Sequence, residues 1–579
     1  MAPFEFPCGS RALAGIMIDT GMRLESVTLT VLAIASIAVA QTSRSVGDGV
    51  YTQEQANRGK TAYTAQCVSC HGAEMRGNDE TPGLTGDAFL ANWRKRSVDD
   101  LFEKVRVSMP AGKPGSLSRQ TNVDILAYIL AVNKFPAGNT ELGSQTEVLK
   151  EIKFQTPAAL QAAPEATARA SAPAPVTDPA PVLEEGKPID RRPPEKADDQ
   201  PAFPEQTRAP YHASAPYNVT TLIDHLPAPW SLAFLPDGKI LLTERLPGSL
   251  RILDKNGILS GPVAGVSALA SPGAKDIGLL DVQLDPHFST NHQIFLTFFD
   301  YIDNTNSNTC VARGRFDEAK AALIDAKVIF RAQPAIPTKR LGGKTGGRVA
   351  FGRDGSIFLS IGDRSDSPPW DVAQRLDTDL GKIVHITADG APAPDNPFIG
   401  EPGVLPEIWA YGNRNPEGLA FDPATGRLWE NEHGPRGGDE LNIIERGKNY
   451  GWPVIVHGID YPGESIGEGI THKEGMEEPA YYWDPVIAPS GLAFYTGNLF
   501  PQWKGSLFVG GLRSMMLDRL TVKNDKVVAE EPLLVEMHAR IRDVRVGPDG
   551  AVYVLTDSGT AGIQPRTPLT SKLVKLTPK

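Results

Sequence analysis

The chain has 579 residues, of which 41% are hydrophobic and 22% are charged, so it is long enough for two or more globular domains. Its formal net charge of −11 and isoelectric point near 5.5 exclude nucleic acid as the main partner, and the sequence contains no basic patch with interleaved aromatics. Its four cysteines make no disulfide framework, because two of them belong to the motif at residues 67–71.

Residues 1–40 have the pattern of an export signal. Arg23 precedes the apolar run VTLTVLAIASIAVA, which ends in the small-x-small pattern Ala38-Val39-Ala40. The run is short for a membrane span. Residues 1–21 are out of place before such a signal, which makes Met22 a candidate start. We expect cleavage near Gln41, no stable membrane span in the mature chain, and a periplasmic location.

Residues 67–71 read Cys-Val-Ser-Cys-His, the CxxCH signature of covalent haem attachment. Two thiols at this spacing can add to the two vinyl groups of haem, and His71 then reaches the iron. A redox CxxC would need a thioredoxin-like context, and a zinc site would need a second Cys/His pair, which this region lacks. The motif therefore predicts haem c bound through Cys67 and Cys70, with His71 as an iron ligand.

The second iron ligand is expected at Met109. Met75 lies too near His71 to reach the opposite face of the iron, whereas Met109 sits in SMPAGKPGSLS, before the helical pattern VDILAYILAVNKF. This arrangement resembles the methionine loop and last helix of class I cytochromes c, although Met109 could serve packing alone. A His/Met pair raises the haem potential, which suits an electron acceptor. We assign residues 41–154 to a small all-α cytochrome c domain in which Leu84, Phe89 and Trp93 wall the haem.

Residues 155–212 are rich in Ala, Pro and charged residues and contain little that can form a core. We interpret this stretch as a semi-extended linker. It would keep the haem domain at a high effective concentration beside its neighbour.

Residues 213–579 repeat one plan: an apolar strand, a turn of Pro, Asp and Gly, and a second apolar strand that ends in polar residues. Six copies begin near positions 231, 279, 347, 418, 491 and 542. The unit of roughly 50 to 70 residues is close to a propeller blade with loop insertions. The pattern predicts an all-β, six-bladed β-propeller, whose ligands would bind where loops of different blades meet at the central channel.

The stretch from Tyr411 to Pro453 carries the most chemistry. It is dense in Asn, Asp, Glu, Arg and Gly, and its loops offer the oxygen ligands that calcium favours. Its segments RNPEGLAF, EHGPRGGDELN and NYGWP follow one another at close spacing. They resemble the soluble quinoprotein glucose, aldose sugar and sorbosone dehydrogenase family, and the resemblance covers essentially all of residues 213–579.

The resemblance implies two cofactors in the propeller, pyrroloquinoline quinone (PQQ) and calcium. It places PQQ contacts at Arg414 and Asn415, and at the arginine pair Arg540 and Arg542 in HARIRDV. Alternate residues of a strand share a face, so both guanidiniums can point the same way, although a solvent-facing charged strand is the commoner fate of such a pair.

Two further cofactor contacts are implied. Arg513, in GGLRSM, stands where the family usually has a lysine, which keeps the charge but not the geometry. Trp483, in YYWDPVIAPSG, would cover the quinone face or be a core aromatic, and the sequence favours neither.

The calcium ligands implied by the family are backbone carbonyls of Gly434 and Pro435. There the cation would polarise the quinone carbonyl. Glu440 and Tyr450 match a second, structural calcium site, and a simple turn or cap role is nearly as good an interpretation for each.

The substrate end departs from the family. The family's catalytic His, four residues before the Arg of a HxGGR-like string, is Lys344 here, while Asp363 in SIGDRSD keeps its spacing. An ordinary Lys is protonated at neutral pH, although burial can turn a lysine into a base. The family's Gln before GLLD is replaced by Asp276, which is either the base or a partner of Lys344. The predicted catalytic set is therefore Lys344, Asp363, Asp276 and Arg414.

The leading hypothesis is a periplasmic dehydrogenase that oxidises an aldose sugar or a related polyol or alcohol. Hydride would pass to PQQ and electrons to the fused haem, then to an acceptor such as a soluble cytochrome or a terminal oxidase. The alternative is a non-catalytic ligand-binding or electron-transfer propeller that has lost the catalytic His. A calcium-dependent lactonase would need more convergent acids and would gain nothing from haem.

Overall fold

The structure is a computed structural model of the chain. It describes residues 44–71, 75, 83–93, 96–110, 115–154, 183–246, 248–271, 277–301, 306–337, 343–364, 370–460, 463–558, 560–561, 564–565 and 569–579. The predicted export signal at residues 1–40 and the linker residues 155–182 lie outside these ranges. None of the helices within the described ranges has the length and apolar character that a membrane crossing requires.

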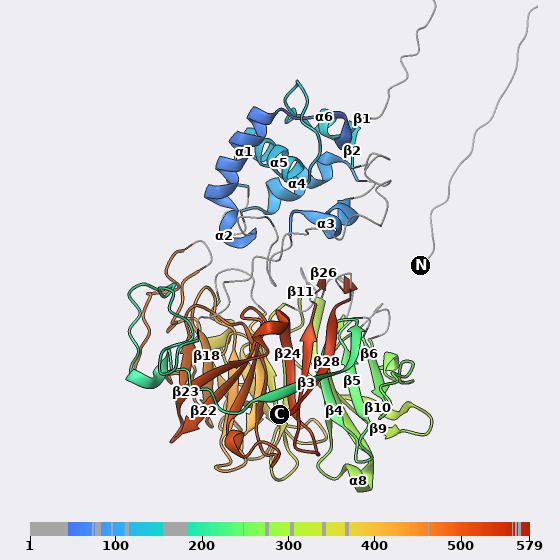
Figure 1. The fold of residues 1–579 in the computed structure, drawn as a ribbon, viewed down its shortest axis with the longest axis vertical. Coiled ribbons are helices and arrows are strands. Elements are labelled where there is room, and N and C mark those ends of the chain that lie inside the picture. Colours follow the sequence, from blue (N-terminus) through green and yellow to red (C-terminus); the bar gives the residue numbers. More distant parts are fainter. Residues whose placement is uncertain are drawn as a thin grey trace, which may run out of the picture. The chain divides into compact units, whose positions relative to one another are not determined.

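The N-terminal part is a small helical domain (Figure 1). Its helices are α1 (Gln53–Gln66), α2 (Val68–His71), α3 (Gly86–Trp93), α4 (Val98–Ser108), α5 (Arg119–Val132) and α6 (Thr146–Glu151), with η1 at Val46–Asp48; β1 (Arg44–Ser45) pairs with β2 (Ile152–Lys153). Helices α1 and α5 cross closely, since a Cβ at Gly59 would lie 1.8 Å from the Asp124 carbonyl oxygen. A glycine is therefore required at this crossing.

The C-terminal part confirms the predicted six-bladed propeller (Figure 1). Among the described strands, six antiparallel sheets follow the chain. The first sheet consists of β4 (Pro229–Phe234), β5 (Ile240–Glu244) and β6 (Ser249–Leu253), and the second of β7 (Ile277–Leu284), β8 (Gln293–Tyr301), β9 (Asn306–Asp317) and β10 (Ala322–Arg331). The third consists of β12 (Gly346–Phe351), β13 (Ile357–Ile361), β14 (Lys382–Ile386) and β15 (Ile408–Tyr411), and the fourth of β16 (Pro416–Phe421), β17 (Leu428–Glu432), β18 (Asp439–Ile444) and β19 (Tyr481–Trp483). The fifth consists of β20 (Pro489–Phe494), β21 (Leu507–Gly511), β22 (Leu517–Lys523) and β23 (Lys526–Leu533), and the sixth of β24 (Arg540–Val546), β25 (Val552–Asp557), β28 (Ser571–Pro578) and β3 (Tyr217–Leu226).

Shorter elements lie between these strands: η3 (Ser267–Leu269), α8 (Phe288–Asn291), β11 (Ile336–Pro337), η4 (Asp371–Gln374), η5 (Pro501–Trp503), η6 (Val535–Met537) and the pair β26 (Thr560–Ala561) and β27 (Gln564–Pro565).

The sheets close into a ring in two ways. The first strands of the sheets, β4, β7, β12, β16, β20 and β24, contact one another in a closed cycle, which makes them the inner strands around the channel. The sixth sheet takes its outer strand, β3, from the start of the propeller, so the two ends of this part of the chain pair with each other from Leu226↔Ser571 to Tyr217↔Pro578. Pairing the ends removes a free strand edge from the fold.

Residues 183–212, which we name the strap, correct the predicted linker. They pack against the fourth and fifth sheets instead of forming a free tether. Arg208 Nη2 donates to the Asp484 carbonyl at 2.8 Å, and the Ala209 N–H donates to the Tyr481 hydroxyl at 2.9 Å. Ile189 and Ala209 join the hydrophobic cluster of these sheets. Composition hid this, because a few well-placed apolar and hydrogen-bonding groups are enough to hold an extended segment on a preformed surface.

His457 fastens the strap to the propeller through an ion pair. Its ring is 1% exposed and stacks on Tyr482, with Nδ1 at 3.1 Å from Asp199 Oδ1 and Nε2 at 3.6 Å from Glu478 Oε2. Burial alone would lower the pKa of His457, but its hydrogen bond to Asp199 and the nearby carboxylate of Glu478 outweigh burial and raise the pKa to about 9. The imidazolium is therefore the stable form in the folded chain at neutral pH.

This pair makes stability depend on pH. A folded pKa near 9 lies above the ordinary histidine value, so the stabilisation is complete below about pH 6.5 and disappears as the pH rises through 9; its full size is about 3 kcal/mol. We expect Asp199→Asn to lower the free energy of unfolding at pH 6 by about 2 to 3 kcal/mol, and by much less at pH 10. Denaturant unfolding at both pH values measures this, with Glu474→Gln, at an exposed carboxylate, as the control. An equal loss for Asp199→Asn at both pH values would contradict the ion pair.

Candidate active site

Each inner strand of the propeller shifts its register against the second strand of its sheet near its first residues. The shifts lie between Pro229 and Ser231, Leu279 and Val282, Gly346 and Val349, Pro416 and Gly418, Pro489 and Leu492, and Ile541 and Asp543. A β-bulge adds a residue and redirects its side chain. The side chains larger than serine within these shifts are those of Trp230, Leu280, Asp281, Arg348, Glu417 and Arg542.

Arg348 lies at the centre of a buried cluster around the channel. Its Nε donates to the Glu417 carbonyl at 2.8 Å and its Nη2 to the Arg542 carbonyl at 3.2 Å. Its Nη1 lies 3.1 Å from Asp543 Oδ1, and its guanidinium carbon lies 3.9 Å from the centroid of the Trp230 ring. One side chain thereby joins the first, third, fourth and sixth sheets.

Asp281 brings the second sheet into the same cluster. It accepts from the Ser231 hydroxyl at 2.6 Å, from the Val349 N–H at 3.0 Å and from Arg545 Nη2 at 2.9 Å. We name Asp281, Arg348, Asp543 and Arg545 the hub. The sequence pattern shows none of its pairings, because its members come from three different sheets.

Arg542, a predicted cofactor contact, is 5% exposed and belongs to an ionic chain beside the hub. Its Nη2 donates to Asp557 Oδ2 at 3.0 Å and its Nη1 to Glu417 Oε2 at 3.3 Å. The other oxygen of Glu417 accepts from Asn415 Nδ2 at 3.2 Å. The structure thus brings together two predicted residues, Arg542 and Asn415, through a glutamate that sequence reasoning missed.

Arg245, which follows β5, is a further cation that the sequence analysis did not single out. Burial lowers the pKa of Arg245, and the positive charges of Arg542 and Arg540 act in the same direction against Asp557 and Glu417. These groups therefore share one region. Arg540 itself is half-buried. The signal that could have found Arg245 is its position among the polar residues after the second strand of a repeat. Clustered guanidiniums suit a ligand with several carboxylates.

Arg414 closes over the loop that follows β17. Its Nη1 donates to the carbonyls of His433 and Gly434 at 3.0 and 2.7 Å. Both carbonyls therefore accept from one guanidinium, and the calcium role that the resemblance implies for Gly434 stays a prediction. Pro435 is buried next to it.

Asp439 fixes the same loop from the other side. It accepts from the Gly434 N–H at 2.8 Å and from the Ile487 and Ala488 N–H groups at 2.7 and 2.6 Å. Burial raises the pKa of Asp439 to about 6, against the opposing effect of His433 and these N–H groups. The loop is therefore held in place by its own sheet and by the chain that leads into the fifth sheet.

Glu440, predicted for a second calcium, lies in a cluster with Glu430 and Glu432. Asn442 Nδ2 donates to all three carboxyls, at 3.2 to 3.4 Å. Burial, with the neighbouring carboxylates, raises the pKa of Glu432 to about 8 and that of Glu440 to about 7. No group of three or more His, Cys, Asp or Glu in the described part of the chain is arranged to hold a metal ion. The Tyr450 hydroxyl donates to the Ile443 carbonyl and accepts from the Glu445 N–H, which matches the turn role.

Lys344, in the position of the family's His, pairs with Asp363. Its Nζ lies 3.4 Å from Asp363 Oδ1, and Asp363 Oδ2 accepts from Trp452 Nε1 at 2.8 Å. Lys344 and Arg414 both lie against the Trp452 ring, at 5.9 and 5.3 Å from its centroid. Three of the four predicted catalytic residues thus meet around one indole. The fourth, Asp276, lies outside the described residues.

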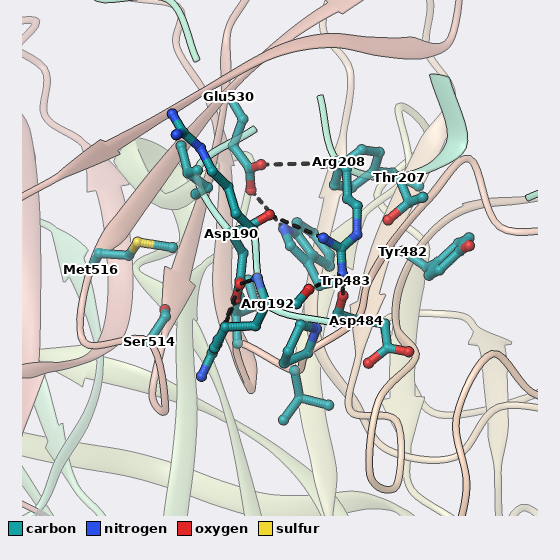
Figure 2. Close-up of a pocket in the computed structure, with 16 residues that line it drawn as sticks. Asp190, Arg192, Thr207, Arg208, Tyr482, Trp483, Asp484, Ser514, Met516 and Glu530 are labelled. Atoms are coloured by element: carbon teal, nitrogen blue, oxygen red, sulfur yellow. Dashed lines mark hydrogen bonds and ion pairs between the residues drawn. The ribbon is translucent and has the colours of Figure 1, made fainter. Parts of the chain in front are cut away.

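Trp483 is buried in the hydrophobic cluster of the fourth and fifth sheets, which favours the second of its two interpretations, a core aromatic. It lies on β19, the outer strand of its sheet, and its Nε1 donates to Glu530 at 2.8 Å. It helps to line a cavity of about 460 Å³ between the strap and the fourth and fifth sheets. Figure 2 shows Met516 and Ser514 on one side of this cavity and Tyr482 on the other.

Arg513, a predicted cofactor contact, is exposed, and its backbone N–H donates to the Ile487 carbonyl at 2.9 Å.

In the helical domain, the predicted haem residues border one hydrophobic cluster. His71, which ends α2, is 5% exposed, and Met109, which follows α4, is half-buried against the cluster. Cys67 and the predicted haem-wall residues Leu84, Phe89 and Trp93 belong to the same cluster or pack on it. The side chain of Cys70 lies outside the described residues. Apolar walls around a histidine and a methionine fit a haem group.

Comparison with known proteins adds independent findings. The chain matches the family described as Glucose / Sorbosone dehydrogenase over residues 226–564, and that described as Cytochrome C oxidase, cbb3-type, subunit III over residues 54–129. Aldose sugar dehydrogenase YliI of Escherichia coli strain K12 is 42% identical over 344 residues, 59% of this chain and 91% of that protein.

The chain is also similar to solved structures of sugar dehydrogenases. A glucose dehydrogenase is 45% identical with a TM-score of 0.56, covering 62% of this chain and 99% of that one. The PQQ-bound form of aldose sugar dehydrogenase from Streptomyces coelicolor is 28% identical with a TM-score of 0.50, covering 64% of this chain and all of that one.

The hub supports a stability prediction. Replacing Arg348 by Met leaves Asp281 and Asp543 buried with less compensating charge, and breaking such a pair costs about 3 to 5 kcal/mol. We expect that loss in urea unfolding of Arg348→Met, while Arg353→Met, at an exposed position of the same sheet, stays within about 0.5 kcal/mol of the parent. A loss below about 1 kcal/mol for Arg348→Met would show that the sheets do not depend on the hub.

Proposed function

We propose that this chain, which belongs to the Glucose / Sorbosone dehydrogenase family, is a periplasmic PQQ-dependent dehydrogenase of aldose sugars or related polyols. Its own cytochrome c domain receives the electrons through a covalent haem c and passes them to an external acceptor. The observation that carries this proposal is the group of guanidiniums around Arg542, of which Arg542 is buried and Arg245 and Arg540 are half-buried, in a chain that also has a CxxCH motif.

The chain's own residues divide the binding work. Arg542, Arg540 and Arg245 provide positive charge for the carboxylates of PQQ, and Asn415 provides an amide donor. The carbonyls of Gly434 and Pro435 hold calcium. When bound, PQQ supplies the hydride acceptor, calcium polarises its carbonyl, and haem c accepts electrons one at a time.

Lys344 takes a different role from the histidine that it replaces. Its amino group pairs with the buried Asp363, and in this role it donates a hydrogen bond to an oxygen at the substrate end. Asp276 then remains the candidate that accepts the substrate's hydroxyl proton.

A second candidate function is a non-catalytic binding propeller with an attached haem. The pairing of Lys344 with Asp363 favours it, because this pair leaves no neutral base at the family's position. The two candidates differ in whether a sugar reduces the haem.

The first test follows the visible spectrum of the oxidised full chain while calcium, PQQ and then a panel of sugars and polyols are added. We expect growth of the haem α-band only when PQQ and a substrate are both present, with the same addition lacking PQQ as the control. PQQ binding without haem reduction by any substrate would support the non-catalytic propeller. Absence of PQQ binding would refute the proposed function.

Restoring the family residue tests the role of Lys344. A neutral imidazole accepts a proton near neutral pH, whereas a paired ammonium does not. We expect Lys344→His to raise turnover at pH 7 by about tenfold or more and to move the rise of the pH profile toward neutrality. Lys504→His, at an exposed lysine, is the control. An unchanged profile would show that a base at position 344 adds nothing to the proton transfer, and would leave Asp276→Asn as the deciding variant.

A further inference from the structure

Glu432, the last residue of β17, touches the segment that carries two predicted cofactor contacts. It is 2% exposed, and its Oε2 accepts the backbone N–H groups of Arg414 and of Asn415, the latter at 3.1 Å. Its Oε1 lies 3.3 Å from Asn413 Nδ2. One carboxyl group therefore holds three consecutive residues of the chain that leads into β16.

The bonds continue back to the chain that follows Glu432. The Arg414 guanidinium donates to the carbonyls of His433 and Gly434, and the His433 N–H donates to the Asn415 carbonyl at 3.1 Å. Residues 413–415 and 432–434 are thus joined in both directions. The side chains that would face PQQ and the carbonyls that would face calcium depend on the same set of bonds.

A carboxyl group suits this position for a physical reason. The N–H groups of Arg414 and Asn415 precede the first residue of β16 and have no partner within the strand ladder. Buried N–H groups without an acceptor are costly. Glu432 provides one oxygen that satisfies both donors at once.

We propose that Glu432 is a positioning residue for the cofactor. It fixes the backbone of Arg414 and Asn415 so that their side chains meet the planar, anionic quinone in a preset geometry. The inference rests on the proposed function, because the ligand that it concerns is PQQ. Glu432 itself does not touch the ligand.

Glu430 provides a matched control. It lies two residues earlier on β17, is fully buried and also accepts from Asn442 Nδ2, at 3.2 Å. It makes no bond to Arg414 or Asn415 among the described contacts. If both glutamates only stabilise the fold, replacing either one should change PQQ affinity equally. If Glu432 positions the cofactor contacts, its replacement should weaken PQQ binding more than that of Glu430.

The experiment compares Glu432→Ala with Glu430→Ala in the full chain. Titration with PQQ at saturating calcium gives the Kd, and thermal unfolding without PQQ gives the structural cost of each variant. We expect both variants to lower Tm, but Glu432→Ala to weaken PQQ binding roughly 10- to 100-fold and Glu430→Ala less than about threefold.

Glu432→Gln is the rescue variant. The amide oxygen of the new Gln side chain can accept both N–H groups. The Oδ1 atoms of Asn413 and Asn442 have no hydrogen-bond partner among the described residues. Once the amide groups of these two Asn residues rotate, their Oδ1 atoms can accept from the NH2 of the Gln side chain. We expect PQQ affinity within about fivefold of the parent. If Glu432→Ala does not fold, Glu432→Asp and Glu430→Asp repeat the comparison. The shorter side chain at position 432 cannot reach the N–H groups of both Arg414 and Asn415.

The outcomes separate the two proposals. A parent chain that binds no PQQ refutes the proposed function and this inference with it. A parent that binds PQQ, with Glu432→Ala binding equally well or Glu430→Ala losing as much affinity, overturns the positioning role alone.

Discussion

The propeller depends on the ion pairs of Arg348 at its centre. A buried guanidinium must be compensated on every side, and here the partners come from several sheets: Asp543 by charge, Glu417 and Arg542 by backbone carbonyls, and Trp230 by its ring. The Arg348 guanidinium makes all of these contacts only when the sheets have their correct positions relative to one another. The inner strands are therefore fixed relative to one another, and so are the loops at their ends that carry the candidate site.

The same irregularity produces both the hub and the site. A regular strand would alternate its side chains between the two faces of its sheet. The bulges add a residue near the start of each inner strand, and Arg348, Glu417 and Arg542 occupy these added positions. Charged side chains thereby reach the axis of an all-β core, where each is paired. Cofactor binding would then use charges whose burial is already stabilised by the fold.

The contacts of Lys344 and the packing of the strap are two features that the resemblance to the family did not predict. Lys344, which the resemblance places where the family has a histidine, lies beside the buried carboxylate of Asp363 and the indole of Trp452. The strap covers the fourth and fifth sheets and belongs to the propeller, so the segment available to separate the haem domain from the propeller is shorter than composition suggests. Both features arise from contacts between residues that are distant in the sequence, such as Asp199 with His457.

The sequence by itself determined the architecture and the family, and it predicted the candidate site. The six repeated strand–turn–strand units predicted the propeller, and short motifs predicted His71, Arg414, Asn415 and Gly434, because local patterns and close spacing are written along the chain. Only the tertiary structure decided which charges meet. It placed Trp483 in the core, paired Lys344 with Asp363, packed residues 183–212 on the propeller and brought Arg245, Glu417 and Glu432 to the site. Those outcomes depend on bulges and on pairings between sheets, which a linear pattern does not encode, since burial forces each charge to find a partner wherever the fold provides one.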